Sequence, residues 1–385
     1  MTDGPKRPCP VWFSEPQLGI FIHWGIFTIP AWAPRGRAIH ELMGEDFDIS
    51  AVLTPYSEWY ENALRVEVSP TRARHLKLYG DKPYTDFRPE FDSAAEAFDA
   101  DAWADLFVEC GARYVVFVTK HHDGYCLWPT DVPNPHRPGW NTSRDFTGEL
   151  AAAVRARGLR FGVYYSGGLD WTFRNSPIAN IGDMFACVPT EDDYRRYAFA
   201  QSKELIDRYR PSVFWNDICW PNGEDVARLI DYYYSVVPDG VVNDRWLANS
   251  AFFNSLRDPD TRAGFNAMLK ARTAGGIQEE TPAPYADFRC VEFGLGVIPK
   301  DMKWEACRGL GLGFGHNTAE EPQDFLQAQG LIDLYSDITS RRGNLLINIG
   351  PRADASVPDL QTIPLRALGR HLRSKPDRAQ GGLAF

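Results

Sequence analysis

Residues 114–128 of the 385-residue chain read YVVFVTKHHDGYCLW. The run begins with six mostly β-branched or aromatic residues that lack the apolar/polar alternation of a half-exposed strand, so it predicts a parallel strand buried on both faces. The apolar run stops at Lys120, and two histidines and an aspartate follow directly. Polar groups at the C-terminal end of a buried parallel strand are typical of barrel enzymes, which carry their chemistry at that end.

Seven further runs of this kind recur along the chain, with helix-like stretches between them. Alternation of strands and helices implies a parallel sheet with helical crossovers, and eight strands predict an α/β fold, a (β/α)8 TIM-like barrel. The other predicted strands are residues 18–23, 159–165, 212–217, 240–244, 288–293, 310–314 and 344–349. The predicted helices are residues 99–110, 143–157, 191–209, 225–236, 322–340 and 359–374.

The predicted domain organisation is one catalytic barrel at 1–374 with a polar C-terminal tail at 375–385. Two segments, 26–112 and 246–287, do not fit simple strand–helix alternation. The first must hold extra helices as well as a long loop, and the second predicts a long loop because its periodicity is weak. Long loops inside a compact domain are more often functional than idle.

Composition narrows the classes of function and the compartment. The net charge is −10 and there is no basic run, which argues against a nucleic-acid surface. No apolar run approaches the roughly 18 residues of a membrane span, and the N-terminus lacks the apolar core of a secretory signal. The seven cysteines form no C-x-x-C motif and suit a reducing compartment. We therefore expect a cytoplasmic location, with the oligomeric state left open and a homo-oligomer included.

All eight predicted strands carry a polar or titratable group at or near their C-terminal ends. Asp217 and Glu292 lie at or near the ends of strands four and six, where two carboxyl groups would suit glycoside hydrolysis. Asp217 alone is equally typical of a helix N-cap. Glu292 stands in an apolar strand, where a carboxylate is seldom buried without a partner, so a pocket is favoured.

The adjacent His121 and His122 also suggest a metal-binding pair. On an extended strand, however, neighbouring side chains point to opposite faces, so two adjacent histidines rarely share one ion. We therefore expect no metal site. A metal-dependent barrel hydrolase is kept as the less favoured alternative.

These segments resemble motifs of the α-L-fucosidases of glycoside hydrolase family 29, in the same order and over most of the chain, from Trp12 to about Leu372. The matching motifs are FIHWG at 21–25, SEWY at 57–60, YTDFRP at 84–89, TKHHDGYCLW at 119–128, YYS at 164–166, FWND at 214–217, VNDRW at 242–246 and GNLLINIGP at 343–351.

The resemblance implies a retaining exo-hydrolase of terminal α-L-fucosides that needs neither metal nor cofactor and forms a covalent fucosyl-enzyme, with transfucosylation left open. Asp217 matches the family nucleophile. The acid/base lies in the most variable part of the family; Glu292 is nominated, with Glu279, Glu280 and Glu305 as rivals. The positions that match the fucose pocket are His23, Glu58, Trp59, His121, His122, Tyr164, Trp215 and Arg245, and Trp24 and Trp246 are expected as further walls.

The expected partner is a small carbohydrate, either an α-L-fucoside or a fucosylated glycan, and neither nucleic acid nor membrane. Family members usually carry a C-terminal β-sandwich after the barrel. Here only the helix at 359–374 and a short tail follow the last strand, so we expect the barrel without that domain. A catalytically silent barrel that binds fucose or another carbohydrate is the main alternative function.

Overall fold

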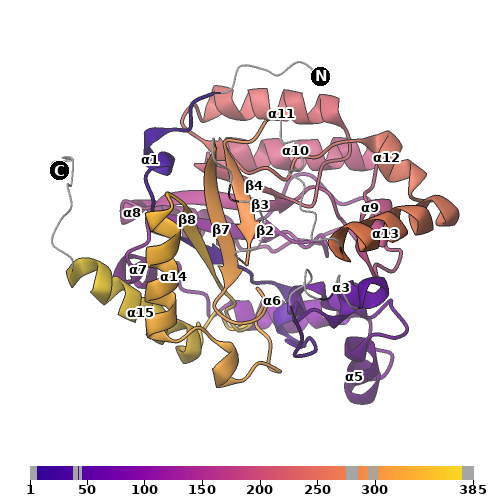
Figure 1. Cartoon of the computed structure of the whole chain (residues 1–385), viewed down its shortest axis with the longest axis horizontal. Helices are drawn as coiled ribbons and strands as arrows, with labels where there is room; N and C mark the ends of the chain where they lie inside the picture. The colour runs from indigo at the N-terminus through magenta and orange to yellow at the C-terminus, as the bar shows by residue number, and fades with distance from the viewer. Residues whose placement is uncertain are drawn as a thin grey trace.

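The computed structural model describes residues 7–37, 42, 46–274, 285–293, 298 and 302–374. The predicted tail at 375–385 and the rival acids Glu279 and Glu280 lie outside the described residues. Eight parallel strands form one curled sheet in the order β5-β4-β3-β2-β1-β8-β7-β6 (Figure 1). The strands are β1 (Leu18–Ile22), β2 (Tyr114–Lys120), β3 (Arg160–Ser166), β4 (Val213–Asp217), β5 (Val241–Val242), β6 (Phe288–Glu292), β7 (Lys303–Gly309) and β8 (Asn344–Ile349).

The barrel is nearly closed, and Asp287 links its two edge strands. Its backbone N–H donates to the carbonyl oxygen of Val242 over 3.0 Å, and its Oδ2 accepts from the Val242 N–H over 2.8 Å. Farther along the same seam, the backbone N–H of Cys290 donates to Oδ1 of Asp244 over 3.1 Å. Together with the eight parallel strands, this closure confirms the predicted TIM-like barrel.

Aromatic side chains fill the barrel at the N-terminal ends of the strands. Phe13 of the short helix α1 (Val11–Ser14) plugs this end, with its ring centroid 5.6 Å from that of Tyr114 and 4.6 Å from that of Phe288. Gly19 leaves room for Tyr114, because a Cβ there would lie 2.3 Å from the tyrosine Cζ. The plug closes one end of the barrel, so the open end is at the strands' C-termini.

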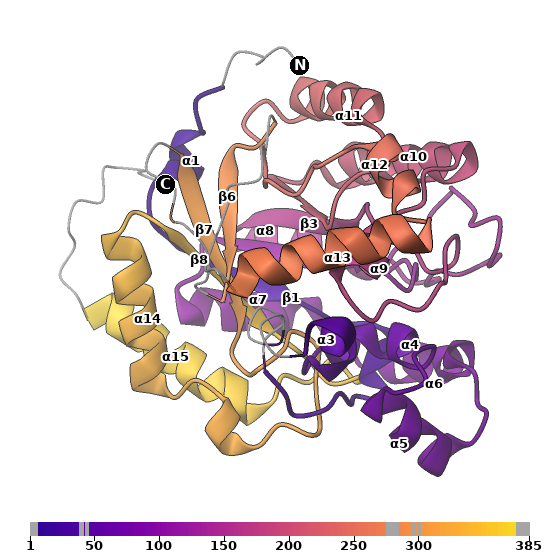
Figure 2. The ribbon, with the colours of Figure 1, turned by 45° about the vertical axis from the view of Figure 1, so that its right-hand side comes forward.

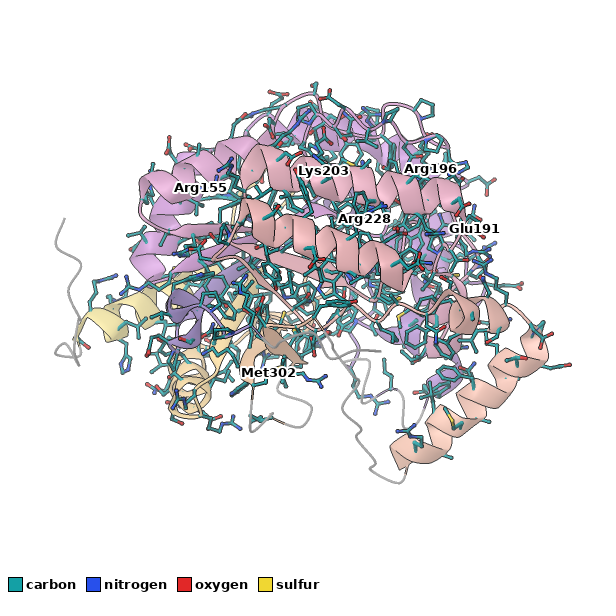
Figure 3. All side chains as sticks on the ribbon, turned by 90° about the horizontal axis from the view of Figure 1, so that it is seen from above. Arg155, Glu191, Arg196, Lys203, Arg228 and Met302 are labelled. Atoms are coloured by element: carbon teal, nitrogen blue, oxygen red, sulfur yellow. The ribbon has the colours of Figure 1, made fainter. Side chains whose placement is uncertain are left out.

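Helices cover the outside of the barrel (Figure 2). Capping residues set the ends of these helices. In α7 (Ala100–Cys110), for example, the Asp99 side chain accepts from the N–H of Ala102 at the start, and Gly111 ends the helix in the left-handed conformation. Helices α10 (Asp192–Tyr209) and α11 (Gly223–Val236) lie side by side and present Arg196 and Arg228 to solvent (Figure 3). The six predicted helices are present, and all but the last have shifted starts: α7 (Ala100–Cys110), α8 (Phe146–Ala156), α10 (Asp192–Tyr209), α11 (Gly223–Val236), α14 (Ala328–Ser340) and α15 (Asp359–Ser374). No described helix is both long enough and apolar enough to cross a membrane.

The first insertion holds extra helices, as predicted, and a further helix, α9 (Ile181–Ala186), follows β3. These helices surround the C-terminal side of the barrel. The helices of the first insertion, α3 to α6, are grouped together (Figure 2). In the 26–112 segment these elements are η1 (Ile26–Thr28), η2 (Phe47–Ile49), α3 (Ser50–Leu53), η3 (Ser57–Trp59), α4 (Tyr60–Ala63), α5 (Pro70–Tyr79), η4 (Tyr84–Phe87) and α6 (Arg88–Ala95).

The prediction of a long loop at 246–287 is wrong, because α12 (Ser250–Ser255) and α13 (Pro259–Ala274) occupy much of it. Asp258 begins the second of these helices by accepting from the N–H of Thr261 over 2.8 Å. Helix α13 packs on the peripheral α9 rather than on the barrel. It therefore needs no broad apolar stripe, and its sequence lacks the periodicity that marks a core-facing helix.

The seventh predicted strand, 310–314, is also wrong. The observed strand is β7 (Lys303–Gly309), which pairs with β6 and β8. The prediction missed this strand because polar residues interrupt it and leave no apolar run. Glu305 points into the barrel, while Trp304 and Ala306 join the outer core. The following glycine-rich segment turns back instead, and at Gly309 a Cβ would lie 2.0 Å from the carbonyl oxygen of Gly313. The fifth strand is shorter than predicted, with only Val241–Val242 paired.

Candidate active site

A cavity of about 190 Å³ opens at the C-terminal ends of the strands. Strands β3, β4 and β6 and the segments directly after β1, β2 and β5 supply most of its polar groups, and η3 closes one side with Glu58 and Trp59. The predicted site residues that line it are His23, Glu58, Trp59, His121, His122, Tyr164, Trp215, Asp217, Arg245 and Glu292.

The sequence reasoning missed several apolar and aromatic residues of this cavity. Ile181 and Met184 come from α9, and Ile218 follows β4 directly. Tyr56 stands just before the SEWY motif of the first insertion, which was a signal that could have found it. The other residues that the prediction missed are Phe21, Cys307 and Phe314.

Trp24 and Trp246 do not reach the cavity, which corrects their predicted role as walls. Trp24 is 1% exposed and packs against Phe91 and Phe98 in the outer core. Trp246 stacks on Phe214 with ring centroids 5.7 Å apart. Each follows an inward-facing residue, His23 or Arg245, and neighbouring side chains in extended backbone point to opposite sides.

Asp217 is the last residue of β4 and points into the cavity. Its Oδ2 accepts from the hydroxyl of Tyr164 over 2.7 Å, and its Oδ1 accepts from Nη1 of Arg245 over 2.7 Å. It is not the cap of the following helix, because α11 begins at Gly223 behind Asn222, which accepts from the N–H of Glu224. The Asp217 carboxylate is therefore not used as a helix cap and is directed into the cavity.

The surroundings of Asp217 keep it ionised. Burial by itself raises the pKa of this carboxyl, but the positive charge of Arg245, the nearby ring of His122 and the hydroxyl of Tyr164 together hold the pKa below its ordinary value of 3.8. An ionised carboxylate that is fixed by donors on both oxygens is suited to act as a nucleophile.

Both candidate catalytic carboxyl groups precede a residue in the left-handed region of backbone space. Ile218 has φ +69° and Phe293 has φ +52°. This conformation costs a β-branched or bulky residue of the order of 1–3 kcal/mol and persists only where the surroundings enforce it. At Ile218 it lets the backbone N–H donate to Oδ1 of Asp217 over 2.8 Å. The strained turn thus fixes the orientation of the carboxylate.

Arg245 joins the two carboxyl groups. Its Nη2 donates to Oε2 of Glu292 over 2.6 Å while its Nη1 holds Asp217. The guanidinium carbon lies 4.8 Å from the ring centroid of Trp215. The side chain of Glu292 is 29% exposed, against 11% for that of Asp217. The site therefore has one enclosed and one more open carboxylate that face each other across a single guanidinium group.

Two histidines present hydrogen-bond acceptors to the cavity. Asn348 donates its amide to the carbonyl oxygen of Phe314, so its Oδ1 must accept from Nδ1 of His23, 2.6 Å away. Ser166 donates to the carbonyl oxygen of Leu169 and so accepts from Nδ1 of His122, also over 2.6 Å. Burial is the main cause that lowers the pKa of both rings to about 4, so both are neutral near pH 7. In a neutral ring with a protonated Nδ1, Nε2 is an acceptor.

His121 and His122 do not point to opposite faces, which corrects the expectation from strand alternation. Strand β2 ends at Lys120, so the two histidines lie in a turn, with ring centroids 4.1 Å apart. His121 also stacks on Tyr164 at 5.8 Å. Its Nδ1 is buried and has no hydrogen-bond partner within the described part of the chain.

The turn that carries these histidines rests on a buried ion pair. Nζ of Lys120 lies 2.8 Å from Oδ2 of Asp170, and both side chains are 0% exposed. Lys120 also sits over the ring of Tyr165 at 4.3 Å. Next to Asp170, the N–H of Trp171 donates to the carbonyl oxygen of His122 over 2.8 Å. The pair therefore joins the end of β2 to the loop that holds His122.

Two other acidic residues differ in position. Glu58 lines the cavity, and its Oε2 accepts from the N–H of Gly315 over 2.9 Å. Burial raises the pKa of Glu58 to about 8, although backbone hydrogen bonds oppose this. Glu305, a rival for the acid/base role, lies inside the barrel below the cavity, bonded to the hydroxyl of Tyr114 and to Nε1 of Trp215. Among the described residues, no three His, Cys, Asp or Glu side chains are grouped as a metal site requires.

Comparisons with known proteins match the chain to one family over nearly its whole length. The family model described as Alpha-L-fucosidase matches residues 2–376. Tissue alpha-L-fucosidase of Bos taurus is 30% identical over 397 residues, which cover 97% of this chain and 71% of that protein. The alpha-fucosidase of Thermotoga maritima in complex with fucose is 40% identical, with a TM-score of 0.76 over 95% of this chain and 74% of that one. Its complex with a mechanism-based inhibitor has a TM-score of 0.75 at the same identity and coverage.

Proposed function

Because the chain belongs to the alpha-L-fucosidase family of glycoside hydrolases, we propose that it hydrolyses terminal α-L-fucosides by a retaining double displacement. The observation that carries this proposal is that Arg245 joins Asp217 and Glu292 through its two terminal nitrogens in the wall of the cavity. Retaining glycosidases need two carboxyl groups about 5–5.5 Å apart, one to attack and one to transfer protons.

In the first step, an oxygen of Asp217 attacks the anomeric carbon of fucose and the bond to the leaving oxygen breaks. Tyr164 and Arg245 hold the carboxylate ionised and oriented before the substrate arrives, which supports this role. The product of the step is a fucosyl ester of Asp217 and a free aglycone.

Glu292 acts as the acid/base in this mechanism. It protonates the leaving oxygen in the first step, and in the second it removes a proton from the water that attacks the anomeric carbon and releases Asp217. An acceptor sugar in place of water would give transfucosylation. The ion pair with Arg245 holds the Glu292 carboxyl at the cavity, across one guanidinium group from Asp217, which supports this role.

The cavity walls fit a deoxy sugar. The acceptor Nε2 atoms of His23 and His122 suit donating sugar hydroxyls, and Nε2 of His122 lies only 3.8 Å from Oδ2 of Asp217. A hydroxyl between those two acceptors would bond to either one. The rings of Trp59 and Trp215 provide apolar surface for the sugar ring and its methyl group. The fucose named in the complex of the Thermotoga maritima relative supports the same class of ligand.

The test is hydrolysis of an aryl α-L-fucoside in the presence of EDTA, with three variants. We expect turnover by the native protein, loss of turnover in Asp217→Gly, and azide rescue in Glu292→Ala. Azide rescue in Glu58→Ala instead would move the acid/base role to that residue. Fucose binding without any turnover would favour the silent carbohydrate-binding barrel, and loss of turnover in EDTA would favour a metal-dependent hydrolase.

A further inference from the structure

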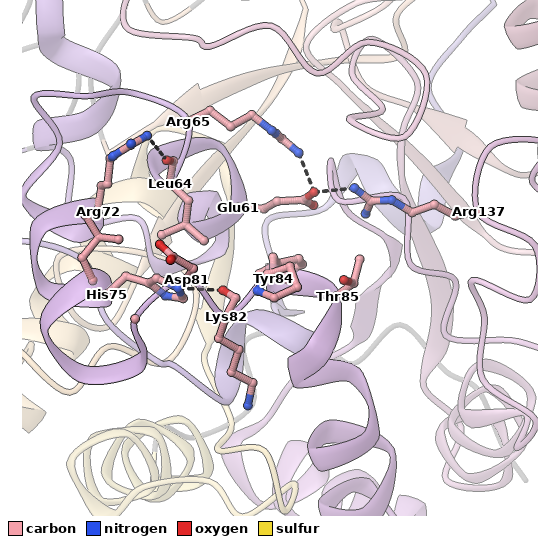
Figure 4. A pocket seen from close by; sticks show the side chains of 13 residues that line it. Glu61, Leu64, Arg65, Arg72, His75, Asp81, Lys82, Tyr84, Thr85 and Arg137 are labelled. Atoms are coloured by element: carbon pink, nitrogen blue, oxygen red, sulfur yellow. Dashed lines mark hydrogen bonds and ion pairs between the residues drawn. The ribbon is translucent and has the colours of Figure 1, made fainter.

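A second cavity of about 340 Å³ lies outside the catalytic centre, among α4, α5 and the segment at 80–85 (Figure 4). Glu61 is central to its polar wall and is only 4% exposed. One carboxylate oxygen, Oε1, accepts from Nη2 of Arg65 and, over 2.7 Å, from Nη2 of Arg137. The three side chains form an Arg–Glu–Arg centre in which the carboxylate is buried, the arginine side chains are 19% and 23% exposed, and only one carboxylate oxygen is used.

Three other polar atoms of this centre lack partners within the described part of the chain. Oε2 of Glu61 and the Nη1 atoms of Arg65 and Arg137 are all buried, and none has a hydrogen-bond partner among the described residues. Unsatisfied buried polar groups are rare and costly, more so when they are charged. The centre therefore offers one unused acceptor beside two unused donors, all from side chains that line a cavity.

This combination favours a hydroxylated ligand over an anion. A hydroxyl group both donates and accepts, so neighbouring hydroxyls on a sugar ring match an acceptor flanked by donors. An anion would satisfy the arginines but would be repelled by Oε2 of Glu61. Two other cations line the cavity and both are engaged: Lys82 pairs with Glu90, and Nη1 of Arg72 donates to the carbonyl oxygen of Leu64 over 3.0 Å. Leu64, Leu76 and Tyr84 add the apolar surface on which a sugar ring can pack.

We propose that this cavity is a second carbohydrate-binding site, which takes a neutral sugar unit of the glycan that carries the fucose. The proposal rests on the proposed function for the identity of that glycan. The two cavities share one short segment, because Glu58 and Trp59 line the catalytic cavity while Glu61 lines the second.

Ring contacts also connect the two cavities. The guanidinium carbon of Arg65 lies 5.7 Å from the ring centroid of Trp171, and that ring lies 5.7 Å from the ring of Trp59. Occupancy of the second cavity therefore acts on a wall of the catalytic one. It should lower KM for fucosylated oligosaccharides and leave KM for a small aryl fucoside unchanged.

Calorimetry with fucose-free neutral disaccharides tests the proposal; lactose, N-acetyllactosamine and cellobiose serve as probes, with the catalytic cavity saturated by fucose. Leu76→Trp places a large ring at the cavity wall. Leu78→Trp is its matched control, because Leu78 is on the same helix, is similarly exposed (51% against 46%) and does not line the cavity. Glu61→Gln keeps an oxygen for the arginines but replaces the unused acceptor with a donor.

We expect at least one probe to bind the fucose-saturated protein, with binding lost in Leu76→Trp, kept in Leu78→Trp and weakened about tenfold in Glu61→Gln. Two results would overturn the proposal: no probe sugar binds, whether or not inorganic sulfate does, or Leu76→Trp binds the probe as well as the native protein. If fucose itself does not bind, the proposed function fails instead. The Leu76→Trp comparison on the unsaturated protein then still tests this site.

Discussion

Replacement of Glu58 by glutamine should change how stability depends on pH. Burial raises the pKa of Glu58 from its ordinary 4.5 to about 8 in the folded protein. Between these values the folded state keeps a proton that the unfolded state has released, so the free energy of unfolding falls as pH rises. Each pKa unit corresponds to about 1.4 kcal/mol, so this single group accounts for a loss of about 5 kcal/mol from below pH 4.5 to above pH 8.

Glutamine has nearly the shape of the protonated carboxyl and can still accept from the N–H of Gly315. Glu58→Gln should therefore match the native protein in stability near pH 5 and exceed it by several kcal/mol near pH 8.5. Chemical denaturation at a series of pH values measures the difference. Glu320→Gln is the matched control. Burial raises the pKa of Glu320 to about 7, and a backbone N–H donates to its carboxylate as well, so this replacement should change the pH dependence of stability in the same direction by a smaller amount. Stability curves of native protein and Glu58→Gln that stay parallel across this range would refute the reasoning.

Three further predictions concern single contacts. Lys120→Met leaves Asp170 buried without its cation and should lower the free energy of unfolding by about 3–5 kcal/mol, measured by denaturant titration; a loss below 1 kcal/mol would contradict a buried pair. Arg245→Met should lower kcat about 100-fold and move the acid limb of the kcat/KM profile to higher pH, since Arg245 is the main charge that lowers the pKa of Asp217; an unmoved acid limb would argue against this coupling. Arg210 ends α10 with φ +41°, a conformation that glycine adopts without strain, so Arg210→Gly should raise the free energy of unfolding by about 1 kcal/mol. Arg208→Gly, inside the helix, should lower it; thermal unfolding of the two variants measures both changes, and equal effects would contradict the prediction.

The sequence predicted the barrel because its strands are buried on both faces and therefore read as apolar runs. It failed at β7, where Glu305 and Cys307 face the barrel interior and Lys303 and Arg308 add charge, so no apolar run exists. It failed at α13 for a related reason: a helix that packs on another peripheral helix needs few apolar residues. Burial pattern identifies elements only where they contact the core.

The site was predictable to the extent that side-chain direction follows from the strand. Side chains alternate along β4, so Trp215 and Asp217 share the inner face. By the same rule, Trp24 and Trp246 lie in the outer core, because each directly follows a residue that faces the cavity, His23 or Arg245. Where the strand ends, alternation stops being informative, as at His121 and His122. Arg245 bridges two carboxyl groups that come from β4 and β6, and it lies itself in the segment after β5. The spacing of these residues along the chain therefore does not predict the bridge.

The most direct test of the account is to trap the fucosyl-enzyme. Incubation with a fluorinated fucosyl fluoride that forms the ester quickly and hydrolyses slowly should add one sugar mass to the intact protein. Peptide mapping by mass spectrometry should then locate that sugar on Asp217, and Asp217→Gly should remain unlabelled. A label on Glu58 or Glu292, or turnover of the fucoside without any covalent adduct, would contradict Asp217 as the nucleophile.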